Sequence, residues 1–178
     1  RLLAYHPIVV GEQVIVSDEK GVTAYNLNQR PGEGTTASAV IAWKHEHQSA
    51  FVSDAMRPPT GLPRYTLTAY GDRIYARMGL PPAPNFAMGM GRFGGGGGNT
   101  NSGASSFLVA LDRAAEGKMI WKKAAAEITL PKRRPDGGRS AGFEGTPISD
   151  GSNVYVALTN RVEMTATYVA CLDAAAGA

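Results

Sequence analysis

One plan of residues recurs three times along this chain of 178 residues, and this repeat limits the possible folds more than any other feature. The first copy reads "HPIVVGEQVIVSDEKGVTAYNLN", from His6 to Asn28. The second begins "LTAYGDRIYARMG" (67–79) and resumes as "SFLVALDRAAEGKMIW" (106–121), and the third reads "TPISDGSNVYVALT" (146–159) followed by "TYVACLDAAAG" (167–177). A repeated unit of this size buries its apolar face by stacking against its neighbours, so the repeat predicts an array of similar units.

Each copy predicts about four short strands. A short apolar strand leads to a glycine turn and a second strand in which apolar and polar residues alternate, and a third strand ends in a polar residue. In the first copy this pattern predicts strands at Ile8 to Val10, Val14 to Ser17, Val22 to Asn26 and Val40 to His45. Four antiparallel strands at a period of about 40 residues or more are typical of a β-propeller blade. Since propellers have about 4 to 8 blades, three blades do not close a ring.

The domain organisation follows from the spacing of the copies within residues 1–178. The blades are expected at about 6–47, 64–123 and 143–178, with a Gly-rich insert at 79–105 that accounts for the greater length of the second copy. The third copy ends at Ala178, where the second continues to a Trp, so we expect the sequence to stop inside a truncated blade. A complete small sandwich of these strands is the alternative, which requires Gly177 to be a true terminus, and the truncated repeat argues against it.

Charge and hydropathy argue against two kinds of partner. The net charge is only +3, and Lys and Arg are scattered apart from "KRRPDGGR" (132–139), whose Pro and Gly favour a solvated loop. A nucleic-acid partner is therefore not expected. No apolar stretch approaches the roughly 20 residues of a membrane helix, so no membrane span is expected in this segment.

The single cysteine and the histidines indicate no reactive centre. Cys171 excludes an internal disulfide, and its place in an apolar strand predicts a small buried side chain rather than a reactive thiol. His45 and His47 share one face of a strand, but a metal site needs a third ligand, and His6 is the only other histidine. Surface residues of an outer strand are the preferred interpretation, and neither a metal site nor a catalytic residue is predicted.

Two further short motifs lack the context that their chemistry requires. "GMGRFG" (89–94) fits the phosphate-binding pattern GxGxxG, but a run of glycines follows it where a helix should begin, so a flexible linker is the better interpretation. "GRSAG" (138–142) fits the pattern of a hydrolase nucleophile, but it lacks the strand-turn-helix arrangement that exposes the serine.

The repeat resembles the pyrroloquinoline-quinone (PQQ) type of β-propeller repeat, whose core phrase is roughly A-L-D-x-x-T-G-x-x-x-W. The chain carries this phrase as Ala110-Leu111-Asp112 with Gly117 and Trp121, as Cys171-Leu172-Asp173 with Gly177, and more loosely as Ala24-Tyr25-Asn26 with Trp43. The resemblance covers most of the chain apart from the insert and the residues at 122–142. It implies an all-β fold of three four-stranded antiparallel blades from a larger propeller of about seven or eight blades.

The resemblance also implies structural roles for the repeated positions. Trp43 and Trp121 are expected to dock against a neighbouring blade, because a Trp buries enough area to join two sheets. Asp112 and Asp173 are expected to fix the tight turns that lead to glycines, as Asp accepts hydrogen bonds from backbone N–H groups two residues further on. Asn26 is the corresponding residue of the first copy, and Gly117 and Gly177 are the turn glycines.

Two kinds of function occur among proteins with this repeat. Quinoprotein dehydrogenases close about eight blades around PQQ and a calcium ion, and many stack two adjacent cysteines on the quinone. Other members bind no cofactor and resemble the lipoprotein that scaffolds assembly of outer-membrane barrels. This chain has one cysteine and no such pair.

We therefore expect a non-catalytic binding or scaffolding module of a larger exported bacterial protein, located in the periplasm or cell envelope. It would have no cofactor and would bind a protein or a small molecule through the loops of its faces. The alternative is a segment of a PQQ- and calcium-dependent dehydrogenase, so whether the protein is an enzyme stays open.

Overall fold

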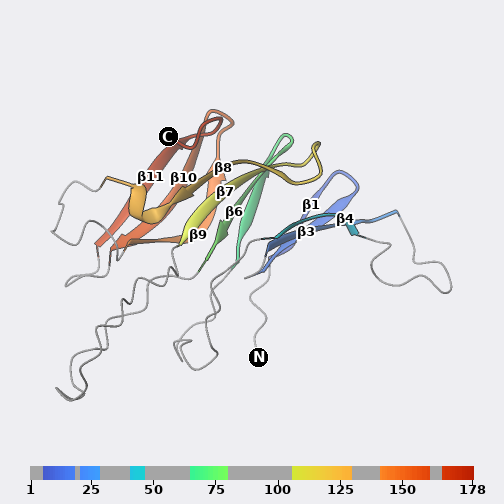
Figure 1. The fold of residues 1–178 in the computed structure, drawn as a ribbon, viewed down its shortest axis with the longest axis horizontal. Helices are drawn as coiled ribbons and strands as arrows, with labels where there is room; N and C mark the ends of the chain where they lie inside the picture. The colour runs from blue at the N-terminus through green and yellow to red at the C-terminus, as the bar shows by residue number, and fades with distance from the viewer. Residues whose placement is uncertain are drawn as a thin grey trace, which may run out of the picture.

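The computed structural model describes residues 6–18, 21–28, 41–46, 65–79, 106–129, 141–160 and 166–178, which form three antiparallel β-sheets (Figure 1). Apart from one 3-10 turn, η3 (Ala125–Glu127), the regular structure of these residues is β-strand. The predicted all-β fold is confirmed. None of the described segments forms a helix long and apolar enough to cross a membrane.

The first sheet follows the predicted strands closely. Its strands, each paired with its neighbour in the sequence, are β1 (Ile8–Val10), β2 (Gln13–Ser17), β3 (Gly21–Asn26) and β4 (Ile41–Glu46). Their bounds differ from the predicted ones by at most one residue. The agreement arises because apolar alternation and turn residues define these strands locally.

The second and third sheets repeat this order. The second contains β5 (Leu67–Tyr70), β6 (Arg73–Met78), β7 (Phe107–Asp112) and β8 (Lys118–Ala124). The third contains β9 (Ala141–Ser149), β10 (Asn153–Asn160) and β11 (Ala166–Asp173), so it has three described strands where a full blade has four. Met78 pairs with Phe107, so residues 80–105, which lie outside the described part, connect two adjacent strands.

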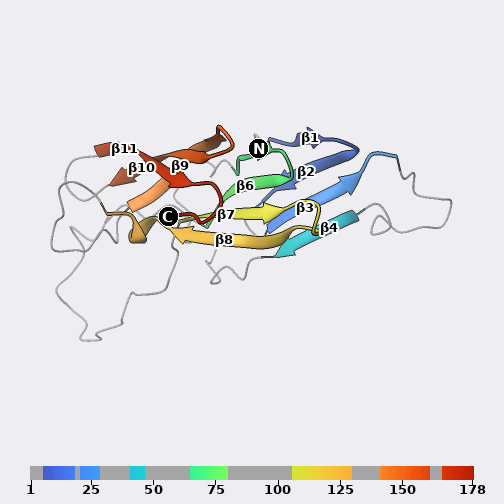
Figure 2. The same ribbon diagram turned by 90° about the horizontal axis from the view of Figure 1, so that it is seen from above.

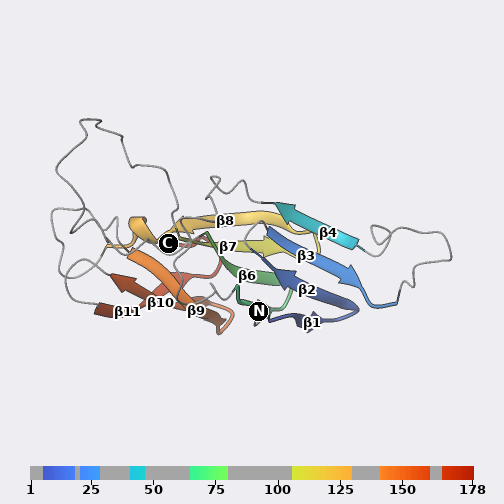
Figure 3. The same ribbon diagram turned by 90° about the horizontal axis from the view of Figure 1, so that it is seen from below.

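The three sheets lie side by side in the order of the sequence (Figures 2 and 3). The first strands of successive sheets are in contact, β1 with β5 and β5 with β9. The outer strands β4 and β8 lie along the opposite edge of the assembly (Figure 3). This is the arrangement of consecutive propeller blades around an inner row of strands.

Two apolar clusters fill the spaces between the sheets. The cluster between the first and second sheets is built from Ile15, Val22, Ala24, Trp43, Leu67, Ile74, Ala76, Met78, Phe107, Val109 and Leu111. The cluster between the second and third contains Tyr75, Leu108, Ala110, Trp121, Phe143, Val154, Val156, Leu158 and Leu172, among others. The middle sheet is thus buried on both faces, which explains why β7 is an almost continuous apolar run.

Trp121 is expected to contribute strongly to this packing. Its side chain is largely buried, its ring lies 6.0 Å from that of Tyr75, and its indole N–H donates a hydrogen bond to the Ala174 carbonyl at 3.0 Å. Trp121→Ala should therefore lower the free energy of unfolding by about 3–5 kcal/mol in urea titrations followed by circular dichroism. Met119→Ala on the same strand is the control, because Met119 is 46% exposed, and it should change that energy by no more than about 0.5 kcal/mol. Equal effects of the two substitutions would contradict the docking role of the indole.

Candidate functional site

The two repeated aspartates hold the turns that follow β7 and β11. A side-chain oxygen of Asp112 accepts a hydrogen bond from the Ala115 N–H at 3.1 Å. The corresponding oxygen of Asp173 accepts hydrogen bonds from the N–H groups of Ala175 and Ala176 at 2.8 and 2.7 Å. Both carboxylates thus act as acceptors for main-chain donors, as in an Asx turn.

The turn glycines receive the indoles of the preceding sheet. Gly117 and Gly177 have φ angles of 75° and 69°, a conformation that side chains with a Cβ rarely adopt. A Cβ on Gly117 would lie 2.3 Å from the Trp43 ring, and a Cβ on Gly177 would lie 2.7 Å from the Trp121 ring. Each indole therefore packs directly onto the backbone of the next sheet.

A second recurring contact ties the glycine turn of each sheet to the segment that follows its third strand. The residue after the third strand donates its N–H to the carbonyl of the residue after the turn glycine, with N···O distances of 2.7–2.8 Å: Leu27 to Glu12, Arg113 to Asp72 and Ala174 to Ser152. Asn26 precedes the first of these donors and pairs with Gln13 in the β2–β3 ladder. The sequence offered a signal for this contact, because the glycine turn and the polar strand end recur together in every copy.

A polar cluster joins the second and third sheets at the opposite end of the strands. Arg77, at 7% exposure, donates from Nη1 to the Phe143 carbonyl at 2.9 Å. Burial lowers the pKa of Arg77 below its usual value, and the charge of Glu144 acts in the opposite direction. The hydroxyl of Ser106 accepts the Phe143 N–H at 2.9 Å, and Thr66 donates to a β9 carbonyl at 2.9 Å. Nothing in the sequence pattern indicated this cluster.

Of the two histidines expected on the surface of an outer strand, the structure describes only His45. His45 lies on β4 and is partly buried, whereas His47 lies outside the described residues. Burial, followed by the charge of Lys122, lowers the pKa of His45. The ammonium group of Lys122 also lies 4.1 Å from the centre of the Phe107 ring. Within the described ranges no three His, Cys, Asp or Glu side chains come together as a possible metal site.

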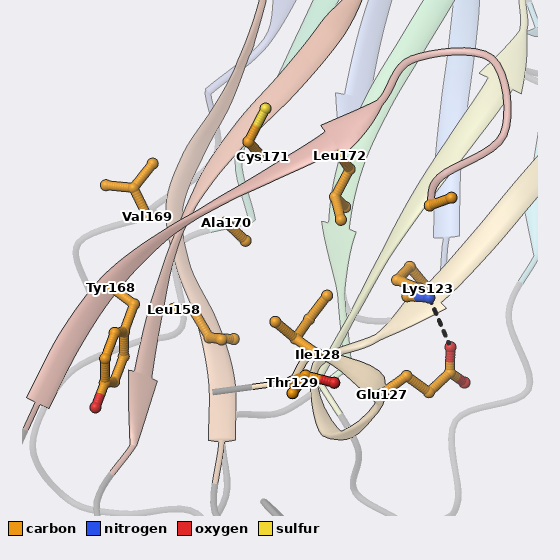
Figure 4. A pocket seen from close by; sticks show the side chains of 11 residues that line it. Lys123, Glu127, Ile128, Thr129, Leu158, Tyr168, Val169, Ala170, Cys171 and Leu172 are labelled. Atoms are coloured by element: carbon orange, nitrogen blue, oxygen red, sulfur yellow. Dashed lines mark ion pairs between the residues drawn. The ribbon is translucent and has the colours of Figure 1, made fainter. Parts of the chain in front are cut away.

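The prediction of a buried Cys171 is wrong, since this side chain is exposed. Side chains alternate along β11, so Ala170 and Leu172 face the second sheet while Cys171 and Val169 point to the other side (Figure 4). At the equivalent position of the second sheet, Ala110 is buried because the third sheet covers it. Alternation showed which residues share a face, but burial of that face requires a neighbouring sheet.

An apolar groove of about 410 Å³ runs beside β11 (Figure 4). It is lined by Lys123, Glu127, Ile128, Thr129, Leu158, Tyr168, Val169, Ala170, Cys171, Leu172 and Ala178. Lys123 and Glu127 form an ion pair at 3.8 Å on one side. Because the paired charges neutralise each other and most other lining groups are apolar, the groove suits an uncharged segment with apolar side chains.

The residues described do not fit the PQQ and calcium site that the quinoprotein resemblance implies. The chain has no second cysteine to pair with Cys171. Asp112 and Asp173 lie in separate turns and accept main-chain hydrogen bonds. The motifs at 89–94 and 132–139 lie outside the described part of the chain. Of the motif at 138–142, residues 138–140 also lie outside it.

The packing of Trp43 on Gly117 can be tested by adding a single methyl group. Gly117→Ala places a Cβ against the indole, whereas Gly71→Ala adds a Cβ at another positive φ angle with no atom within 4 Å. Both variants share the backbone strain, so Gly117→Ala should lower the free energy of unfolding by about 1–3 kcal/mol more than Gly71→Ala. Thermal and urea unfolding measure the difference, and equal losses would show that the indole does not depend on the glycine.

The lowered pKa of His45 predicts a pH dependence of stability. The folded chain binds a proton at His45 less readily than the unfolded chain does, so stability should fall as the pH drops through about 6.5. His45→Gln should make the unfolding midpoint less sensitive to pH between about 7.5 and 5. The exposed His6 provides the control, and His6→Gln should leave the slope unchanged. An unchanged slope in His45→Gln would show that burial of His45 has no energetic effect.

Comparisons with known proteins support the fold alone. No protein-family model and no curated protein matches the sequence. Among solved structures, the chain is similar to a protein described as "Europium-containing methanol dehydrogenase", with a TM-score of 0.57 and 19% sequence identity. The match covers 96% of this chain but only 23% of that protein, so the chain spans less than a quarter of its length. The likeness supports a β-propeller fold for the three sheets.

Proposed function

We propose that the chain contributes three consecutive blades to a larger propeller, which serves as a non-catalytic binding or scaffolding module of an exported bacterial protein. The observation that carries this proposal is that the repeated side chains hold turns and join neighbouring sheets. Asp112 and Asp173 accept hydrogen bonds within their turns, and Trp43 and Trp121 pack on the next sheet. The most recognisable residues of the repeat thus support the architecture, and the envelope location follows the resemblance.

Binding is proposed at the face from which the 80–105 connection leaves. β6 and β10 occupy the same place in their sheets, and the connections 80–105 and 161–165 follow the same end of these two strands. The opposite ends carry the short glycine turns. Because rigid sheets fix the ends of such loops, the loops can vary in sequence and bind a protein or a small molecule. The cluster around Arg77 lies where the strands on either side of the 80–105 connection end, and its hydrogen bonds join the second and third sheets there.

A segment of a PQQ- and calcium-dependent dehydrogenase is the second candidate, favoured by the structural likeness to a methanol dehydrogenase. In that case the cofactor and its calcium ion would be held by residues other than those described. The present blades would contribute the packed frame that keeps such residues in place.

Calorimetric titration with PQQ, in the presence and absence of calcium, distinguishes the two candidates. The binding-module proposal predicts no calcium-dependent binding to the chain or to the intact protein that contains it, and no dye-linked oxidation of alcohols or sugars. A known quinoprotein dehydrogenase in the same buffer is the positive control. Calcium-dependent binding with turnover would overturn the proposal.

A further inference from the structure

His45 lies at the junction between the first and second sheets. It follows Trp43 by two residues on β4, so both side chains leave the same face of this strand. That face meets the second sheet, because the Trp43 ring packs against Gly117 and His45 pairs with Val22, a buried member of the cluster between the two sheets. A change in the charge of this partly buried imidazole therefore acts on the contact between two sheets.

The charge opposite His45 has the same sign as a protonated imidazole. Lys122 pairs with Val109 in the β7–β8 ladder, and Val109 belongs to the cluster that faces the first sheet. The Lys122 ammonium group lies against the ring of Phe107, another member of that cluster. Burial and then the charge of Lys122 lower the pKa of His45, so both oppose its protonation. A proton on His45 thus places two cations at one apolar interface.

The other charged side chains near His45 are engaged elsewhere. Lys44 and Glu46, its neighbours on β4, form an ion pair at 2.6 Å on the opposite face of the strand. Asp18, in the turn before β3, accepts a main-chain N–H of that turn at 2.9 Å. β2 and β3 carry no charged side chain, and both arginines of β6 leave its face toward the third sheet. The carboxylate of β7, Asp112, accepts a hydrogen bond in its own turn, and β8 carries only lysines.

The second sheet carries a compensated charge at the same position. Lys123 follows Trp121 by two residues, as His45 follows Trp43. Its charge is permanent near neutral pH, and Glu127 forms an ion pair with it at 3.8 Å. In the first sheet the charge forms only in acid, and the described strands around it offer a lysine instead of a carboxylate.

We propose that the junction between the first and second sheets is an acid-sensitive hinge, in which protonation of His45 opposite Lys122 loosens the contact between these sheets while the contact between the second and third stays closed. Opening the junction returns the imidazole to water, so a proton binds the open form more readily than the closed form. The open fraction should therefore rise as the pH falls through about 6.5, and it should level off once the closed form is protonated as well. This hinge is independent of what the loops bind, and it goes beyond the proposed binding function.

The two indoles report on the two junctions in a single sample. Trp43 and Trp121 are 6% and 8% exposed, so hydroxyl-radical oxidation of each in the full chain, measured by mass spectrometry, follows the opening of its own junction. The ratio of Trp43 to Trp121 oxidation should rise roughly twofold or more between about pH 7.5 and 5.5. A constant ratio would overturn the proposal, because it would show that this junction does not open by itself in acid.

Substitutions at both partners separate the hinge from general effects of acid. His45→Gln should keep the ratio constant over this pH range, whereas His6→Gln, at an exposed position, should leave the rise unchanged. Lys122→Glu should abolish the rise, because a carboxylate opposite His45 stabilises its protonated form. If Lys122→Glu does not fold, as judged by circular dichroism, Lys122→Gln takes its place and should reduce the rise. A full rise in His45→Gln, or in the folded Lys122 variant, would overturn the proposal.

Discussion

Contact between an indole and a glycine backbone sets the spacing of the sheets, and much of the remaining structure depends on it. The Trp43 ring lies so close to Gly117 that any Cβ would overlap it, and Trp121 has the same relation to Gly177. The glycine must also adopt a positive φ angle, which the preceding turn imposes. Because the aspartate at the start of that turn holds the loop through its side chain, one local motif determines both the turn and the position of the neighbouring sheet.

Different kinds of hydrogen bond stabilise the two ends of the sheets. At the end with the glycine turns, main-chain hydrogen bonds recur in every copy. At the other end, buried side chains of the second sheet bond to the backbone of β9, with Arg77 and Ser106 both meeting Phe143. A buried guanidinium is costly to desolvate and is retained where it makes hydrogen bonds. This end therefore keeps two sheets aligned where the connections are longest.

Local pattern explains which features could be predicted from the sequence. The strands of the first sheet were predicted to within one residue, because their alternation and turn residues are local properties. Burial of Cys171 was predicted wrongly, since it depends on whether another sheet covers the far side of β11. Arg77 was missed because an arginine near the end of a strand looks like a surface residue until the neighbouring sheet is placed. The groove beside β11 likewise depends on which strands pair, and not on the strand itself.

Differences between the copies are more informative about function than the residues they share. Ser17, Arg77 and Ala157 occupy the same register, as each lies six residues after its turn glycine and pairs with Val22, Leu108 or Val169. Shared residues such as the glycines and tryptophans serve the packing that every blade needs. Only the second copy places a buried charge in this register, and the same copy carries the Gly-rich insert predicted at 79–105. The two features occur at the same end of one sheet, and they distinguish the second blade from the other two.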